Sequence, residues 1–159
     1  MHIPETMTLV TAILAQLEHT LTDTQRAADE AHHAATHDES VAETQYDTLG
    51  LEASYLAEGQ SRRVAELQDA IARFHQLPQK TFGDDSPITL GAQILLQQDD
   101  GNLRHLFLGP AAGGVEVTLE GQHITVISPA SPLGTELVQK YLGDEVHIGQ
   151  HTCEIIRIC

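Results

Sequence analysis

In the first half of the chain, apolar and small residues return every three or four positions, which is the period of one helix face. This spacing predicts a first helix over about residues 4–36 and a second over about residues 43–77. Two helices of about 30 residues would pair as an antiparallel coiled-coil hairpin about 45 Å long. The turn is expected near His37–Ala42. The expected inner faces are Val10, Ile13, Leu17, Leu21, Thr24, Ala28, Ala31 and Ala35, then Tyr46, Leu49, Ala53, Leu56, Val64, Leu67, Ile71 and Phe74.

The pattern changes after Pro78, because a proline ends a helix and the apolar residues then alternate as in strands. Residues 78–87 contain glycine, serine and aspartate and predict a linker. Ser131-Pro132 is a helix start, so the short helix Leu133–Leu142 is expected beside the sheet. The strands are expected at Ile88–Gln98, Leu103–Leu108, Val115–Leu119, His123–Ile127, Asp144–Ile148 and Thr152–Ile158.

These elements predict an α+β protein with an N-terminal helical hairpin over residues 1–77 and a C-terminal domain over residues 88–159. The C-terminal domain is expected to be a mostly antiparallel β-sheet with one helix packed against it.

The charge of the chain limits the kinds of partner that it can bind. The formal net charge is −15 over 159 residues, so the surface repels phosphate and direct duplex DNA binding is not expected. A basic protein partner or a cation fits better. Two sparse cysteines and no recognisable signal peptide favour the cytoplasm, and no apolar run is long enough to predict a membrane span.

Acidic residues gather around the predicted turn of the hairpin. No lysine or arginine occurs between Arg26 and Arg62, whereas Asp38, Glu39 and Glu43 lie close together where the helical pattern breaks. Carboxylates at the end of a helical pair can hold a divalent cation or present negative charge to a basic cavity. His33 and His37 are four residues apart on one helix face, so a Zn²⁺ site with Asp38 is an alternative.

The C-terminal half carries a recognisable motif. Residues 127–146 read Ile-Ser-Pro-Ala-Ser-Pro-Leu-Gly-Thr-Glu-Leu-Val-Gln-Lys-Tyr-Leu-Gly-Asp-Glu-Val. This stretch resembles the C-terminal domain of the Gre transcript-cleavage factors (GreA/GreB), in which a strand, Ser-Pro, a short helix ending Leu-Gly and a strand opening Gly-Asp-Glu-Val follow one another. The family also has an acid-tipped N-terminal coiled coil, so the resemblance covers nearly the whole chain.

The resemblance implies a fold and a function. The C-terminal domain would be FKBP-like and would bind RNA polymerase, with Ser131, Pro132, Leu133 and Gly134 in the contact. The hairpin would enter the secondary channel of the enzyme and reach the nascent RNA 3′ end. There Glu39 and Glu43, with Asp38 as the alternate upstream acid, would help hold a Mg²⁺ ion shared with the polymerase. The chain would thus be no enzyme itself but would stimulate RNA hydrolysis by the polymerase.

The acidic tip differs from the family pattern Asp-x-x-Glu-Asn-x-Glu-Tyr. Thr44 replaces the asparagine, and one residue is missing between Glu43 and Tyr46. A second hypothesis therefore stays open, in which the chain binds the secondary channel and regulates or inhibits transcription without cleavage. A third is an FKBP-like isomerase or chaperone with a coiled-coil arm, although the few aromatic residues do not favour an isomerase pocket.

Overall fold

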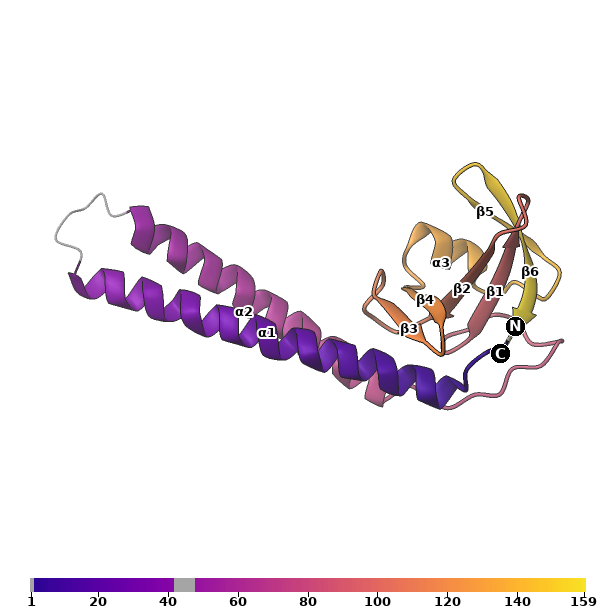
Figure 1. Cartoon of the computed structure of the whole chain (residues 1–159), viewed down its shortest axis with the longest axis horizontal. Helices are drawn as coiled ribbons and strands as arrows, with labels where there is room; N and C mark the ends of the chain where they lie inside the picture. The colour runs from indigo at the N-terminus through magenta and orange to yellow at the C-terminus, as the bar shows by residue number, and fades with distance from the viewer. Residues whose placement is uncertain (1, 42–47) are drawn as a thin grey trace. The chain divides into compact units, whose positions relative to one another are not determined.

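The computed structural model describes residues 2–41 and 48–159, and their side chains except those of residues 35–41, 48–50 and 53. Two long helices come first, α1 (Thr6–Val41) and α2 (Thr48–His75). The remaining elements are β1 (Gln93–Gln98), β2 (Leu103–Leu108), β3 (Glu116–Leu119), β4 (Gln122–Ile127), α3 (Pro132–Leu137), β5 (Glu145–Ile148) and β6 (His151–Ile158). The predicted α+β class, with helices first and a sheet after them, is confirmed (Figure 1).

The chain forms two compact units. The helical unit is Ala15–Ile71, and the sheet unit combines Met1–Leu14 with Ala72–Cys159. This division differs from the expected domains 1–77 and 88–159, because the first turns of α1 and the last turn of α2 belong to the sheet unit. In the part of the chain that the structure describes, no helix is long and apolar enough to cross a lipid bilayer.

Within the helical unit, α1 and α2 run side by side in opposite directions (Figure 1). Their buried residues form a narrow seam in which leucines give way to alanines toward the end of α1. The seam consists of Leu17, Ala28 and Ala31 of α1 and Ala57, Leu67 and Ala70 of α2. Small side chains let two helix backbones approach closely, which fits the alanine-rich stretch of α1.

One predicted seam position is wrong. Leu56 was expected to face α1, yet its side chain is 56% exposed, and its neighbour Ala57 is buried instead. The less exposed positions of α2 follow a seven-residue repeat, in which Ala57, Val64 and Ile71 form one series and Gln60, Leu67 and Phe74 the other. Leu56 lies one position outside this repeat.

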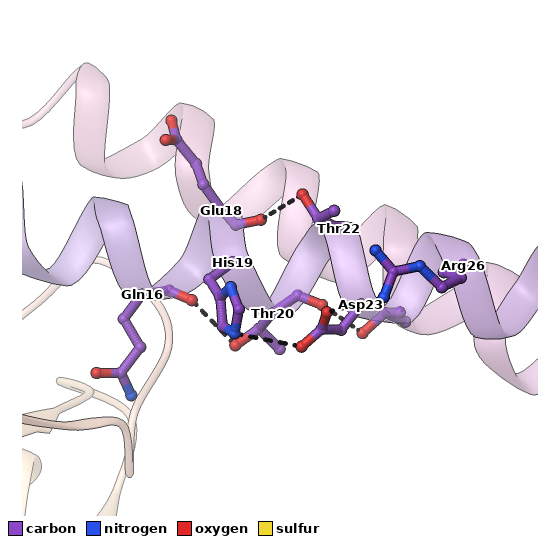
Figure 2. Close-up of polar contacts among 8 residues, drawn as sticks. Gln16, Glu18, His19, Thr20, Thr22, Asp23 and Arg26 are labelled. Atoms are coloured by element: carbon purple, nitrogen blue, oxygen red, sulfur yellow. Dashed lines mark hydrogen bonds and ion pairs between the residues drawn. The ribbon is translucent and has the colours of Figure 1, made fainter.

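The outer face of α1 is polar, and its side chains bond to other groups of the same helix, as Figure 2 shows. The hydroxyls of Thr20 and Thr22 each donate to the carbonyl four residues earlier, at 3.0 Å. The carboxylate of Asp23 lies 3.4 Å from His19 and 3.9 Å from Arg26. Exposed ion pairs of this kind stabilise a protein by about 1 kcal/mol at most, so this face is a solvated surface.

The six strands form one mixed sheet in the order β3-β4-β2-β1-β6-β5. All neighbouring strands are antiparallel except β2 and β4, which are parallel. The parallel pair arises because the β3–β4 hairpin folds back so that β4, and not β3, lies beside β2. The expected first strand Ile88–Gln98 is shorter, since residues 89–92 form a turn with Gly91 at φ 93°.

One face of the sheet holds the hydrophobic core under α3. Burying a leucine or isoleucine side chain contributes about 1.5–3 kcal/mol, so this cluster dominates the stability of the unit. The free thiol of Cys153 lies inside it, and burial raises its pKa. The cluster is Ile88, Ala92, Ile94, Leu96, Leu106, Leu108, Leu137, Val146, Cys153, Ile155 and Ile158.

The opposite face carries a buried polar network that ties the start of α1 to the sheet. The Gln93 Nε2 donates to the Pro4 carbonyl and to the Thr6 hydroxyl, both at 2.9 Å. The Gln93 Oε1 lies 3.0 Å from His105 Nε2, and His105 Nδ1 lies 3.0 Å from the Gln122 amide. Because the Gln93 amide nitrogen donates elsewhere, its Oε1 accepts a hydrogen bond from the His105 Nε2–H.

His105 makes the stability of the sheet unit sensitive to acid. Burial lowers the pKa of this imidazole, against a smaller opposing effect of the Gln122 hydrogen bond. The unfolded chain therefore takes up a proton at about pH 6.5 that the folded chain resists, and stability falls as the pH drops below that value.

We expect the melting temperature to fall between about pH 7.5 and about pH 5.5, and the fall to be smaller in His105→Gln. The difference between the two proteins is the relevant quantity, because all their other ionisable groups are the same. Equal pH profiles would contradict this role of His105.

Candidate functional site

The acidic residues predicted to form the hairpin tip lie at the end of α1 and beyond it. Asp38 and Glu39 occupy consecutive positions in the last turns of α1, which ends at Val41. Glu43 lies outside the described residues, and so do the side chains of Asp38 and Glu39.

The segment predicted to contact a partner, Ser131–Gly134, forms the start of α3. Ser131 is the N-cap, and its hydroxyl accepts a hydrogen bond from the Gly134 N–H at 3.0 Å. The same hydroxyl donates to the Ser128 carbonyl at 2.7 Å. Pro132 occupies the first helical turn, where its missing N–H costs nothing. The predicted helix start is confirmed, and the motif is a tightly bonded loop.

Position 134 has room only for glycine. A Cβ atom at this position would clash with the Ser128 carbonyl oxygen and lie 2.8 Å from its carbon. Gly134 is buried, and its carbonyl accepts from the Val138 N–H at 3.0 Å. The loop before α3 can therefore cross the helix closely only because the residue there is glycine.

The helix predicted at Leu133–Leu142 ends much earlier, at Leu137. Val138 leaves the helical conformation and Gln139 has a φ of 68°. The cause is a pairing with a distant segment. The Gln139 N–H donates to the Ile88 carbonyl and the Ile88 N–H donates to the Lys140 carbonyl, both at 2.8 Å. These bonds replace further helical turns.

Apolar side chains within the predicted helix Leu133–Leu142 and the predicted strand Ile88–Gln98 are exposed. Tyr141 is 47% exposed, Leu142 38% and Leu90 37%. Leu90 and Tyr141 lie on the two segments that the Ile88 hydrogen bonds join. An exposed aromatic residue beside aliphatic ones is typical of a protein-binding surface. The exposure of these residues follows from a long-range pairing, so sequence alone did not indicate it.

A cavity of about 360 Å³ opens on the sheet where strands β2, β3 and β4 meet. His123 Nε2 lies 3.0 Å from the Glu116 carboxylate at this cavity. The lining is mostly polar and consists of Gln98, Asn102, Leu103, Arg104, His105, Glu116, His123 and Thr125. These residues do not form an aromatic pocket suited to a proline side chain.

Among the described residues, the side chains able to hold a metal ion gather at Asp99, Asp100 and His151. All three are exposed. The alternative Zn²⁺ site involves an exposed His33, while the side chains of His37 and Asp38 lie outside the described ones.

Comparison with solved structures finds similarity to Gfh1, a GreA factor homologue. The Gfh1 of Thermus thermophilus has 17% identity and a TM-score of 0.38, and 92% of this chain and 94% of that chain are covered. A second Gfh1 structure has 18% identity, a TM-score of 0.39 and coverages of 92% and 93%. Thermus aquaticus Gfh1 has 20% identity, a TM-score of 0.35 and coverages of 91% and 92%.

No protein-family model matches the chain, and no curated protein is significantly similar to it.

Proposed function

We propose that this chain is a Gre-type bacterial transcription elongation factor. Its sheet unit binds RNA polymerase, its helical hairpin enters the secondary channel, and its acidic tip promotes cleavage of backtracked RNA. In this proposal the hairpin is a coiled coil and the sheet unit is FKBP-like. The chain acts on the hydrolytic activity of the polymerase and is not itself the enzyme.

The observation that carries the proposal is the motif at residues 127–146. It resembles the Gre C-terminal domain in sequence, and it folds as the strand β4, a capped helix start, α3 and then β5. Gly134, one of its four central residues, is fixed by the packing of the loop. The hairpin agrees with the same proposal, since two long antiparallel helices carry an acidic segment at their joined end.

The acids at the tip fit the chemistry that the proposal needs. Mg²⁺ prefers carboxylate oxygens and keeps several water ligands, so Glu39 and Glu43, with Asp38 as the alternate, can add only part of its coordination. When bound, the ion would supply an activated water and stabilise charge on the reacting oxygens. The part of this chain is to bring carboxylates to a site that polymerase and RNA complete.

A second function is favoured by the altered tip. With one residue missing between Glu43 and Tyr46, the upstream acid stands four or five positions from Glu43 instead of three. A carboxylate moved by several Å would no longer reach the ion, and the chain would then occupy the channel and inhibit transcription. The isomerase alternative is disfavoured, because the cavity on the sheet is mostly polar.

Binding to the polymerase tests the proposal directly. Tyr141→Asp should weaken the affinity of the full chain for RNA polymerase by about tenfold or more, because buried aromatic residues dominate interface energies. Leu103→Asp is the matched control, since Leu103 is 43% exposed and lies on β2, outside the motif. Affinity can be measured by fluorescence anisotropy of the labelled chain.

If the wild-type chain fails to bind the polymerase, the proposed function is wrong. If both variants weaken binding equally, the contact is not centred on Tyr141.

A further inference from the structure

Two hairpin ends of the sheet unit meet at a cluster of polar side chains. Asp99 and Asp100 form the turn between β1 and β2, and His151 begins β6. The backbone N–H of Asp99 donates to the Thr152 carbonyl at 3.0 Å, which holds the turn against β6. The His151 Nδ1 lies 2.8 Å from Asp99 Oδ1. One ligand atom from each of Asp99, Asp100 and His151 lies within 4.8 Å of the others.

We propose that Asp99, Asp100 and His151 bind a divalent transition-metal ion of the Zn²⁺, Co²⁺ or Ni²⁺ class. This site is in the sheet unit and is separate from the acidic residues at the end of α1. It does not depend on the proposed function.

The distances suit an ion of this size. Bonds of about 2.1 Å from such an ion to nitrogen and oxygen put neighbouring ligands about 3.0 Å apart in an octahedron and about 3.4 Å apart in a tetrahedron. The 2.8 Å between Nδ1 of His151 and Oδ1 of Asp99 is close to the octahedral value. The ion takes the place of the hydrogen-bond proton between these two atoms. The other pairs of ligand atoms lie within 4.8 Å, so the cluster contracts by at most about 1.8 Å to reach the adjacent octahedral separation of about 3.0 Å.

The aspartates are held in place by bonds that leave lone pairs for an ion. Asp100 accepts from the Asn102 N–H at 3.0 Å and from the Asn102 side-chain amide at 2.8 Å. Gly101 supplies the positive φ of 86° that the turn requires. An ionised carboxylate has about four acceptor positions, so both aspartates keep free ones. Little side-chain order is therefore lost when the ion binds.

The ligand types select the class of metal. Imidazole suits zinc, nickel and copper, whereas magnesium and calcium prefer oxygen ligands alone. Two carboxylates and a neutral imidazole carry two negative charges, and the chain as a whole has a net charge of −15. The hydrogen bond and the charge of Asp99 raise the pKa of His151, so protons compete with the ion. Binding weakens as the pH falls, because the ligand nitrogen must be deprotonated.

Other exposed histidines provide matched controls. His147 Nδ1 lies 3.1 Å from the Glu136 carboxylate, and His123 Nε2 lies 3.0 Å from Glu116. Each of these pairs brings one carboxylate to one imidazole. Within the described residues, the combination of two carboxylates and a histidine occurs only at Asp99, Asp100 and His151.

The test is a titration of the full chain with ZnCl₂, followed by NMR of the histidine ring nitrogens and by calorimetry. The His151 ring signals should shift at the lowest Zn²⁺ concentrations. Asp100→Asn keeps an acceptor for the Asn102 N–H but loses a charge, and it should weaken Zn²⁺ binding by about tenfold or more, since even outer partners of metal ligands contribute about 10–100-fold. His151→Gln should do the same, and His147→Gln should leave the affinity unchanged.

Backbone NMR spectra of the variants check that the sheet unit remains folded. Equal Zn²⁺ affinities in the wild type, Asp100→Asn and His151→Gln would overturn the proposal. It is also overturned if other histidine signals move while those of His151 do not. Binding of MgCl₂ as tight as that of ZnCl₂, and unaffected by His151→Gln, would exclude His151 as a ligand.

Discussion

Gly134→Ala is expected to abolish stable folding of the sheet unit. The new methyl carbon would overlap the Ser128 carbonyl oxygen, far inside contact distance. That oxygen cannot retreat cheaply, because it accepts hydrogen bonds from the Ser131 N–H at 3.1 Å and from the Ser131 hydroxyl at 2.7 Å. Overpacking of side chains costs about 1–3 kcal/mol, and a clash with backbone should reach or exceed the upper end of that range.

Thermal unfolding of the full chain, followed by circular dichroism, measures this effect. Gly83→Ala is the control in the same unit, since the nearest atom to its added Cβ is the Ser86 hydroxyl at 4.0 Å. Gly83→Ala should change stability by less than about 0.5 kcal/mol. A Gly134→Ala protein that melts at the wild-type temperature would show that the loop before α3 can move aside.

Glu43→Ala should eliminate stimulation of RNA cleavage if the chain acts as a cleavage factor. The reason is chemical, because a Mg²⁺ site completed by the polymerase loses one of the few carboxylates that this chain offers. Affinity for the polymerase should stay nearly unchanged, since the proposed contact lies in the sheet unit. The measurement is RNA shortening in a stalled elongation complex with the wild type and the variant.

Glu52→Ala controls for the loss of charge, because Glu52 is an exposed acid on α2. Loss of cleavage in Glu43→Ala alone supports the cleavage function. Equal cleavage by all three proteins would place the chemistry at other residues. Binding by all three without any cleavage would favour the channel-blocking function, with the altered tip spacing as its physical cause.

Much of the architecture could be predicted from local signals. The long helices follow from the three- and four-residue spacing, and strand β2 has the predicted bounds Leu103–Leu108. Errors occur where distant segments decide the structure. The helix after Ser131 is cut short by hydrogen bonds to Ile88, which lies more than forty residues earlier in the sequence. Leu56 and Ala57 are both apolar, so their pattern did not settle which of them faces α1.

The candidate site shows the same limit. The start of α3 was predictable, because a serine cap and a proline act within one helical turn. The exposure of Tyr141 and the contact between Asp99 and His151 were not predictable, because both depend on long-range pairing of strands or loops. Sequence indicates which residues can do chemistry locally, and the sheet decides which of them come together.

The place of β6 in the sheet has a consequence for how the protein is made. β6 lies between β1 and β5, and Ile94 of β1 pairs with Ile158. The sheet therefore cannot be completed until residues 151–158 have left the ribosome, so the edge of β1 that pairs with β6 stays unpaired until then. Pairings between residues far apart in sequence slow folding, which predicts late folding for the sheet unit and early folding for the helices.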